Sequence, residues 1–134
     1  MIAADASAAV AAFAEWHGRH GEIQDALEGT PAIVAHAAFE TYSVLTRIPE
    51  PQRMHGSAVR EQLELRFADR WLGLTSGALR LALARLEKLG VAGGATYDGL
   101  IAITAASNDA TLVTLDQRAL PTYLLVGADV RLVH

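Results

Sequence analysis

The chain has 134 residues, 51% of them hydrophobic, and a formal net charge of −4 at pH 7. This length fits one compact domain spanning residues 1–134, and the apolar content excludes a disordered chain. The acidic balance argues against a protein that coats nucleic acid through charge alone, because such proteins are normally basic. The absence of cysteine excludes disulfides, thiolate metal sites and cysteine nucleophiles.

The sequence contains no sign of a membrane span or of a secretory signal. No segment approaches the roughly 18 continuous apolar residues that a membrane span requires. The first residues lack the basic start and long apolar stretch of a signal peptide, since Asp5 interrupts them. We therefore expect a cytoplasmic protein with no membrane partner.

The first half of the chain predicts short strands alternating with helices. Residues 1–5 are an apolar run that ends in an acid, which is typical of a buried strand, and a second strand-like segment is expected at 33–35. Helices are expected at 7–17, 22–28, 37–47 and 56–70. Glycine and proline punctuate the connections between them, for example at Gly18, Gly21 and Pro49.

The second half of the chain continues the same alternation. A helix is expected at 76–89, with Leu79, Leu83 and Leu86 facing the core, and an apolar helix at 96–107. The pattern then predicts a strand at 111–115, a short helix at 116–120 and a final strand at 130–133. Short apolar strands that alternate with helices indicate a layered α/β fold with a mainly parallel central sheet.

Four acids lack the basic neighbour one helical turn away that surface acids commonly have. They are Asp5, Glu40, Asp98 and Asp116. Asp5 and Asp116 each end an apolar run and begin a helix, at the strand ends where open α/β sheets bind ligands. Four carboxylates that converge on one crevice repel each other unless a cation neutralises them. Their hard oxygen atoms suit Mg²⁺ or Mn²⁺.

Each of these acids also has a purely structural explanation. Asp5 and Asp116 can serve as helix N-caps, and Asp98 can be a first-turn acid that the helix dipole stabilises. Glu40 has the weakest explanation of this kind, because an acid among apolar neighbours is costly to bury. Spacing alone therefore leaves both interpretations open.

Four segments carry a resemblance to a known family. They are residues 2–7 (IAADAS), 38–42 (AFETY), 97–102 (YDGLIA) and 112–120 (LVTLDQRAL). In this order and at these distances they resemble the PIN-domain nucleases, specifically the VapC-type toxins of bacterial toxin–antitoxin pairs, over essentially the whole chain. The resemblance implies a PIN-like three-layer α/β fold. It also implies an endoribonuclease that acts as a toxin and uses Mg²⁺, with Mn²⁺ expected to support activity as well.

The resemblance also assigns roles to the four acids. Asp5, Glu40, Asp98 and Asp116 would form the acidic quartet of the family's active site, with Asp5 and Asp98 as the principal metal ligands. A bound metal would activate water for in-line displacement at phosphorus, and Glu40 or Asp116 would orient that water. The expected substrate is single-stranded RNA, whose exposed bases can be reached.

Three further residues match supporting positions of the family. Ser7 and Thr114 match small hydroxyl positions beside the acids, and Arg118 matches a basic position after Asp116. The chain departs from the family pattern at Gly99 and Gln117 and keeps all four acids. The lost basic residue at position 117 is expected to weaken RNA contact or alter the choice of target.

The resemblance implies two protein partners. One is a protein antitoxin that blocks the site, and the other is a second copy of the chain in a homodimer. We expect these contacts among the apolar and aromatic residues between Tyr42 and Trp71. Trp16 and Trp71 can also stack on bases, although aromatic residues at such positions are more often core or subunit contacts.

Two alternatives differ from an active nuclease. A receiver-like signalling domain has a similar length and clustered acids, but it requires a paired acid after the first strand and a lysine at a later strand end. The only lysine, Lys88, lies within a predicted helix. The other alternative is a PIN-like fold that serves as a non-catalytic RNA-binding module, which an absence of metal-dependent cleavage would support.

Overall fold

The computed structural model describes residues 1–134 and contains one five-stranded sheet. Its strands are β1 (Ile2–Ala4), β2 (Ala32–Val34), β3 (Trp71–Leu72), β4 (Thr111–Thr114) and β5 (Val130–Leu132). The strand order is β3-β2-β1-β4-β5, and every neighbouring pair is parallel. This confirms the predicted parallel α/β fold. The order differs from the β2-β1-β3-β4-β5 order of flavodoxin-like folds, which argues against the receiver alternative.

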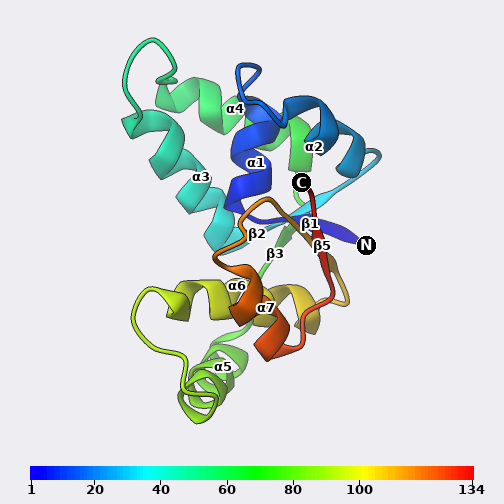
Figure 1. Ribbon diagram of the computed structural model, residues 1–134, viewed down its shortest axis with the longest axis vertical. Coiled ribbons are helices and arrows are strands. Elements are labelled where there is room, and N and C mark those ends of the chain that lie inside the picture. Colours follow the sequence, from blue (N-terminus) through cyan, green and yellow to red (C-terminus); the bar gives the residue numbers. More distant parts are fainter.

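Seven helices cover the two faces of the sheet. They are α1 (Ala6–Phe13), α2 (His20–Ala26), α3 (Ala35–Arg47), α4 (Gly56–Phe67), α5 (Ser76–Lys88), α6 (Ala95–Ser107) and α7 (Leu120–Val126). Figure 1 shows α1 to α4 on one side of the sheet and α5 to α7 on the other, which gives three layers. None of these helices combines the length and the apolar character needed to cross a membrane.

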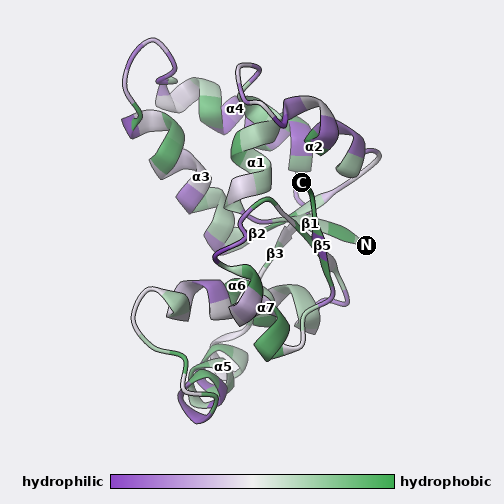
Figure 2. Ribbon diagram, viewed as in Figure 1, coloured by the Kyte–Doolittle hydropathy of each residue, from purple (hydrophilic) through white to green (hydrophobic).

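The centre of the sheet is buried on both faces. Ala3, Ala4 and Ile33 have no exposed surface, as expected for parallel strands between two helical layers. The face of α1 that packs inward consists of small residues, including Ala8 and Ala9, so this helix lies close to β1 and β4. In Figure 2, α1 and α6 are mostly hydrophobic, whereas α2 is largely hydrophilic.

The structure differs from the predicted elements in two places. It contains a two-residue strand, β3, that was not predicted and that pairs only with β2, through Ile33↔Trp71 and Val34↔Leu72. The short helix predicted at 116–120 is instead a turn, and α7 begins at Leu120, with Pro121 in its first turn, and extends to Val126. Proline suits this position because a helix leaves its first amide groups unpaired.

The inward face of α5 also differs from the prediction. Leu86 is buried as expected, but Leu79 and Leu83 are exposed, and Ala82 faces the core in their place. Leucines lie on several sides of this helix, so no single stripe marks the buried face. The small side chain of Ala82 allows α5 to approach the adjacent α6 layer closely.

Candidate active site

The candidate site lies at the carboxyl ends of β1 and β4, the two central strands of the sheet. Asp5 directly follows β1, and Asp116 lies two residues beyond β4. From β1 the strand order runs outward to β2 and β3 on one side and to β4 and β5 on the other. Such a reversal of direction leaves a crevice at the strand ends, where open α/β sheets bind ligands.

Asp5 is only 2% exposed, and hydrogen bonds hold both of its carboxylate oxygens. Ser7 Oγ donates to Oδ1 at 2.6 Å, and the Ala8 amide donates to the same atom at 3.0 Å. The Tyr123 hydroxyl donates to Oδ2 at 2.9 Å. A carboxylate oxygen offers two lone pairs, so Oδ1 is saturated and Oδ2 keeps one acceptor position. Asp5 is therefore limited to a single further contact.

A chain of hydroxyl groups connects Asp5 with the loop after β4. Ser7 Oγ lies 3.3 Å from Thr114 Oγ1 and accepts a hydrogen bond from the Leu115 amide at 2.9 Å. The Asp116 amide donates to Thr114 Oγ1 at 3.0 Å. Because Ser7 gives its only hydroxyl proton to Asp5, Thr114 is the donor between the two hydroxyls. Ser7 and Thr114 therefore connect the carboxylate of Asp5 with the backbone at Leu115 and Asp116.

Asp116 caps the turn that leads into α7. Its Oδ1 accepts hydrogen bonds from the amides of Arg118, at 2.9 Å, and Ala119, at 3.3 Å. The guanidinium Nε of Arg118 lies 3.8 Å from the same oxygen, and its side chain is 94% exposed. The capping explanation thus holds for Oδ1, whereas Oδ2 makes no hydrogen bond and is free to contact a ligand.

Glu40 and Asp98 approach the crevice from the two helical layers. Glu40 lies in the second turn of α3, and its Oε1 is buried with no hydrogen-bond partner. Asp98 lies in the first turn of α6 and is partly exposed. An acceptor atom buried without a partner is unfavourable in a folded protein. Glu40 therefore carries a cost that a bound ligand or ion would relieve.

The acids influence one another's ionisation. Burial raises the pKa of the Asp5 carboxyl, although the hydrogen bonds from Ser7, the Ala8 amide and Tyr123 oppose this shift. Burial also raises the pKa of Glu40, and the charges of Asp98, Asp5 and Asp116 add to the shift, while His36 opposes it. Burial, with the charges of Asp116 and Asp5, raises the pKa of Asp98. The four sequence-predicted acids therefore share one electrostatic environment.

Two residues of this region were missed in the sequence. Tyr123 is buried and donates to Asp5, and burial followed by the Asp5 charge raises the pKa of its hydroxyl. His36, one turn before Glu40, lowers the pKa of that acid. A tyrosine among the leucines and valine of α7 has the pattern of a core residue, and His36 belongs to no ligand motif, so no sequence signal marks either one.

The donor set fits a hard divalent cation. No three His, Cys, Asp or Glu side chains lie close enough to coordinate one ion as they stand. A cation would nevertheless give a partner to the free Oδ2 of Asp116 and to the unpartnered Oε1 of Glu40. It would also favour the ionised forms of Asp5, Glu40 and Asp98, whose pKa values are raised without it. All four side chains offer oxygen ligands, which suit Mg²⁺ or Mn²⁺.

Comparison with known proteins shows the family of the chain. The sequence model of the family described as "PIN domain" matches residues 2–122. The chain is 43% identical to Ribonuclease VapC40 of Mycobacterium tuberculosis over 133 residues, which cover 99% of both chains. It is 36% identical to Ribonuclease VapC27 of the same species over 132 residues, 96% of this chain and 94% of the relative. The resemblance seen in the sequence is confirmed, and the chain belongs to the PIN domain family.

Proposed function

We propose that this protein is a metal-dependent endoribonuclease, whose acidic quartet of Asp5, Glu40, Asp98 and Asp116 holds Mg²⁺ or Mn²⁺. The main support is the electrostatic influence that Asp5, Glu40, Asp98 and Asp116 have on one another near the carboxyl ends of β1 and β4, together with one carboxylate oxygen of Glu40 that is buried and unpartnered. Membership of the PIN domain family and similarity to two proteins named ribonucleases support the same reaction class. When bound, the cation would stabilise negative charge on the phosphate and make water more acidic.

The hydrogen bonds of the site favour distinct roles for the acids. Asp5 would contact the cation through Oδ2 alone, because Ser7 and the Ala8 amide saturate Oδ1. Asp98, which is more exposed, would be the second principal ligand. Tyr123 and Ser7 would fix the orientation of the Asp5 carboxylate, and Thr114 would hold the amide of Asp116, without touching RNA.

Glu40 is better suited than Asp116 to accept the proton of the attacking water. Its Oε1 is buried and unpartnered, so the attacking water would satisfy it, whereas two amide hydrogen bonds to Oδ1 fix Asp116 and leave its Oδ2 for the cation. In the proposed step the water oxygen bonds to phosphorus while the bond from phosphorus to the leaving oxygen breaks, and the leaving oxygen keeps the electron pair and takes a proton from solvent water. Glu40 takes the proton of the water, and the exposed Arg118 contacts a neighbouring phosphate.

The reaction is tested by incubating the purified protein with total cellular RNA and Mg²⁺, Mn²⁺ or a chelator. We expect discrete products that require either cation and a loss of rate of about 100-fold or more in Asp98→Asn. The exposed Asp25 of α2 offers a matched control, and Asp25→Asn should cleave at the rate of the unmodified chain. Absence of cleavage with both cations would support the non-catalytic RNA-binding module instead.

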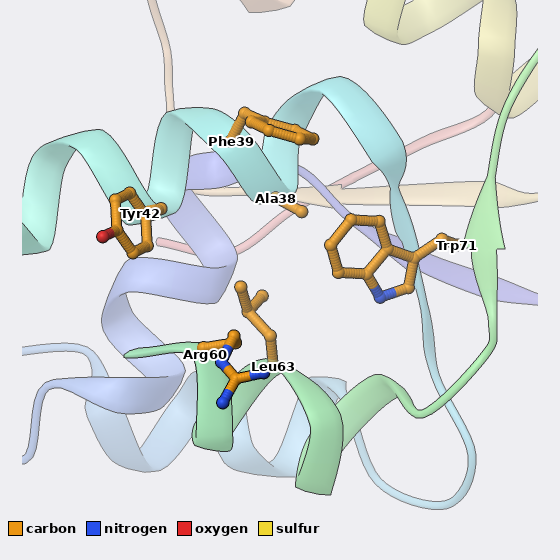
Figure 3. Close-up of a pocket in the computed structure, with 6 residues that line it drawn as sticks. All are labelled: Ala38, Phe39, Tyr42, Arg60, Leu63 and Trp71. Carbon is orange, nitrogen blue, oxygen red and sulfur yellow. The ribbon is translucent and has the colours of Figure 1, made fainter. Parts of the chain in front are cut away.

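A groove between α3 and α4 is the proposed site for a protein antitoxin. The groove has a volume of about 300 Å³ and is lined by the residues drawn in Figure 3: Ala38, Phe39, Tyr42, Arg60, Leu63 and Trp71. Phe39 and Trp71 meet edge to face at 6.4 Å, and both are exposed. An antitoxin segment with apolar anchors and an acidic side chain opposite Arg60 would fill this groove.

Two exposed leucines of α5 are the proposed contact of a homodimer, in place of the segment between Tyr42 and Trp71 that the sequence suggested. Leu79 and Leu83 are exposed one turn apart on this helix, which forms the outer edge of its layer (Figure 1). Two copies related by a twofold axis would each cover the other's leucines. We expect Leu79→Glu with Leu83→Glu to give a monomer by light scattering. Phe39→Glu should leave the dimer intact and abolish the complex with a co-produced antitoxin, and unchanged size in both variants would contradict these assignments.

A further inference from the structure

The rings of His36 and Tyr97 stack face to face beside the acids. Their centroids are 5.4 Å apart, and the ring planes differ by 2°. His36 lies in the first turn of α3, one turn before Glu40, and Tyr97 directly precedes Asp98 in the first turn of α6. The stacked pair therefore joins the two helical layers at the point where each contributes an acid.

Tyr97 presents an aromatic surface to solvent at this position. Its side chain is 54% exposed, and its hydroxyl makes no hydrogen bond in the structure. His36 is only half-buried, and it covers one face of the tyrosine ring. The ring is therefore held by stacking alone, and neither core packing nor a polar contact explains an exposed tyrosine here.

Electrostatic attraction of RNA to this crevice has few sources. The cation that the acids would hold and Arg118, the basic residue close enough to alter the pKa of Asp98, would attract a phosphate, while the chain as a whole carries a formal net charge of −4. Proteins that bind single strands without a strongly basic groove must obtain affinity from another source. Stacking of bases on aromatic rings is such a source, because every base presents a flat aromatic face.

We propose that the His36–Tyr97 stack is a platform for one unpaired nucleobase adjacent to the cleaved phosphate. This assignment rests on the proposed ribonuclease function and makes it more specific. The base stacks on the open face of Tyr97, and its nucleotide places the phosphate over the acids. Because larger rings stack more strongly, the platform favours a purine at this one position of the RNA.

Trp16, beyond the carboxyl end of α1, provides a matched control that is adjacent to none of the four acids in the sequence. Its side chain is also 54% exposed, and its ring also lies against a histidine, His17, at 5.9 Å with a tilt of 38°. It follows the carboxyl end of α1, whereas Asp5 caps the amino end of the same helix. A general effect of removing an exposed aromatic residue would appear at Trp16 as well.

The experiment uses single-stranded RNA 12-mers with 2-aminopurine, a fluorescent purine quenched by stacking, at one position in turn. Binding is measured in Ca²⁺, with a gel to verify that the RNA stays intact, and cleavage of the same RNAs is measured in Mg²⁺. We expect Tyr97→Leu to remove the added quenching at one position, weaken binding about tenfold and raise KM about tenfold, with kcat within about twofold. Tyr97→Phe and Tyr97→Trp should retain the quenching, and Trp16→Leu should match the unmodified chain.

The possible outcomes separate the platform from the nuclease. In one outcome, Asp98→Asn abolishes metal-dependent cleavage and Tyr97→Leu does not change KM. This result overturns the platform and keeps the nuclease. Quenching that depends on Tyr97 in a protein that does not cleave keeps the platform and overturns the nuclease. Loss of binding in Tyr97→Phe equal to that in Tyr97→Leu would assign the effect to the hydroxyl and overturn the platform. A change of oligomeric size in Tyr97→Leu would do so too, by making Tyr97 a protein contact.

Discussion

Asp5 combines two roles that its sequence position presents as alternatives. Its Oδ1 caps α1 through the Ala8 amide, and its Oδ2 remains available on the side of the crevice. Tyr123 contacts only Oδ2, so this hydroxyl sets the direction of the remaining lone pair. The geometry of the proposed ligand therefore depends on a residue near the other end of the chain.

Replacing Tyr123 by phenylalanine tests this dependence. The change removes one hydrogen bond to a buried carboxylate and keeps the ring, so the fold should persist with a stability loss of about 1.5–3 kcal/mol. We expect the Mg²⁺ concentration that gives half-maximal cleavage to rise about 10–100-fold, the range typical of residues that orient metal ligands. Cleavage rates across a Mg²⁺ titration measure this effect.

Thr104→Val is the control for the loss of stability alone. Thr104 is buried in α6 and donates one hydrogen bond, to the Leu100 carbonyl at 2.7 Å. This variant should lose stability without a change in Mg²⁺ dependence. Equal Mg²⁺ dependence in Tyr123→Phe and Thr104→Val would show that Tyr123 only supports the core.

The four acids and the supporting hydroxyls of Ser7 and Thr114 could be singled out from the sequence, but the contact from Tyr123 could not. Asp5 and Asp116 follow apolar strands, and strand ends of a parallel sheet meet at one edge, so the sequence predicts that they lie together. Tyr123 reaches Asp5 across 118 residues of chain, through a helix whose start was placed wrongly. Whether an aromatic hydroxyl meets a carboxylate depends on the packing of α7 against the sheet, which no local pattern records.

Among the secondary-structure elements, α5 and α6 pack through a glycine. Gly99 in α6 is buried, and a methyl group at this position would overlap the Cδ2 atom of Leu86 in α5. The departure from the family pattern at position 99 therefore has a steric reason. It lets Leu86 of the neighbouring helix rest directly on the α6 backbone, next to Asp98.

Gly99→Ala should destabilise the protein in spite of the better helix propensity of alanine. Overpacking against Leu86 costs about 1–3 kcal/mol, and propensity offsets about 0.5–1 kcal/mol of this. Gly77→Ala in α5 is the control, because a methyl group there meets no atom within 4 Å. Urea unfolding should give opposite signs for the two variants. A stabilised Gly99→Ala would show that Leu86 shifts without cost.

The strands and helices differed in how well the sequence marked them. The central strands were predicted because their apolar runs end at turn residues or acids. Strand β3 was missed because two residues at the edge of a sheet carry no alternation. The prediction of the buried face of α5 was wrong. Leu79 and Leu83 have the spacing of core residues but are exposed, and the small Ala82 is buried in their place. Burial here depends on the partner α6 rather than on hydrophobicity.

For the whole molecule, the crowded acids link stability to pH. The pKa values of Asp5, Glu40 and Asp98 are raised from their ordinary 3.8, 4.5 and 3.8, first by burial. The native state therefore binds these protons more tightly than the unfolded chain does. Its stabilisation is fully present below the ordinary pKa values and is lost as the pH rises through the raised ones.

We therefore expect substitutions that neutralise these acids to stabilise the metal-free protein, and the stabilisation to be larger at higher pH. The Tm of the double variant Glu40→Gln/Asp98→Asn in a chelator should exceed that of the unmodified chain by a margin that grows from about pH 4 to pH 7. Mg²⁺ at about 100 times its Kd should stabilise the unmodified chain by about 2.7 kcal/mol and leave the double variant unchanged. A margin independent of pH would contradict the assigned pKa directions.

The pairing of β1 with β4 has a consequence for when the site can exist. Ile2 is in register with Thr111, so the centre of the sheet joins the first strand to one formed late in the chain. A nascent chain leaving the ribosome can form α1 to α4 early, but it carries Asp5 without Asp116 or Tyr123 until synthesis is almost complete. Translation itself therefore delays the assembly of the four carboxylates, and a protein shortened before β4 would contain no complete cluster.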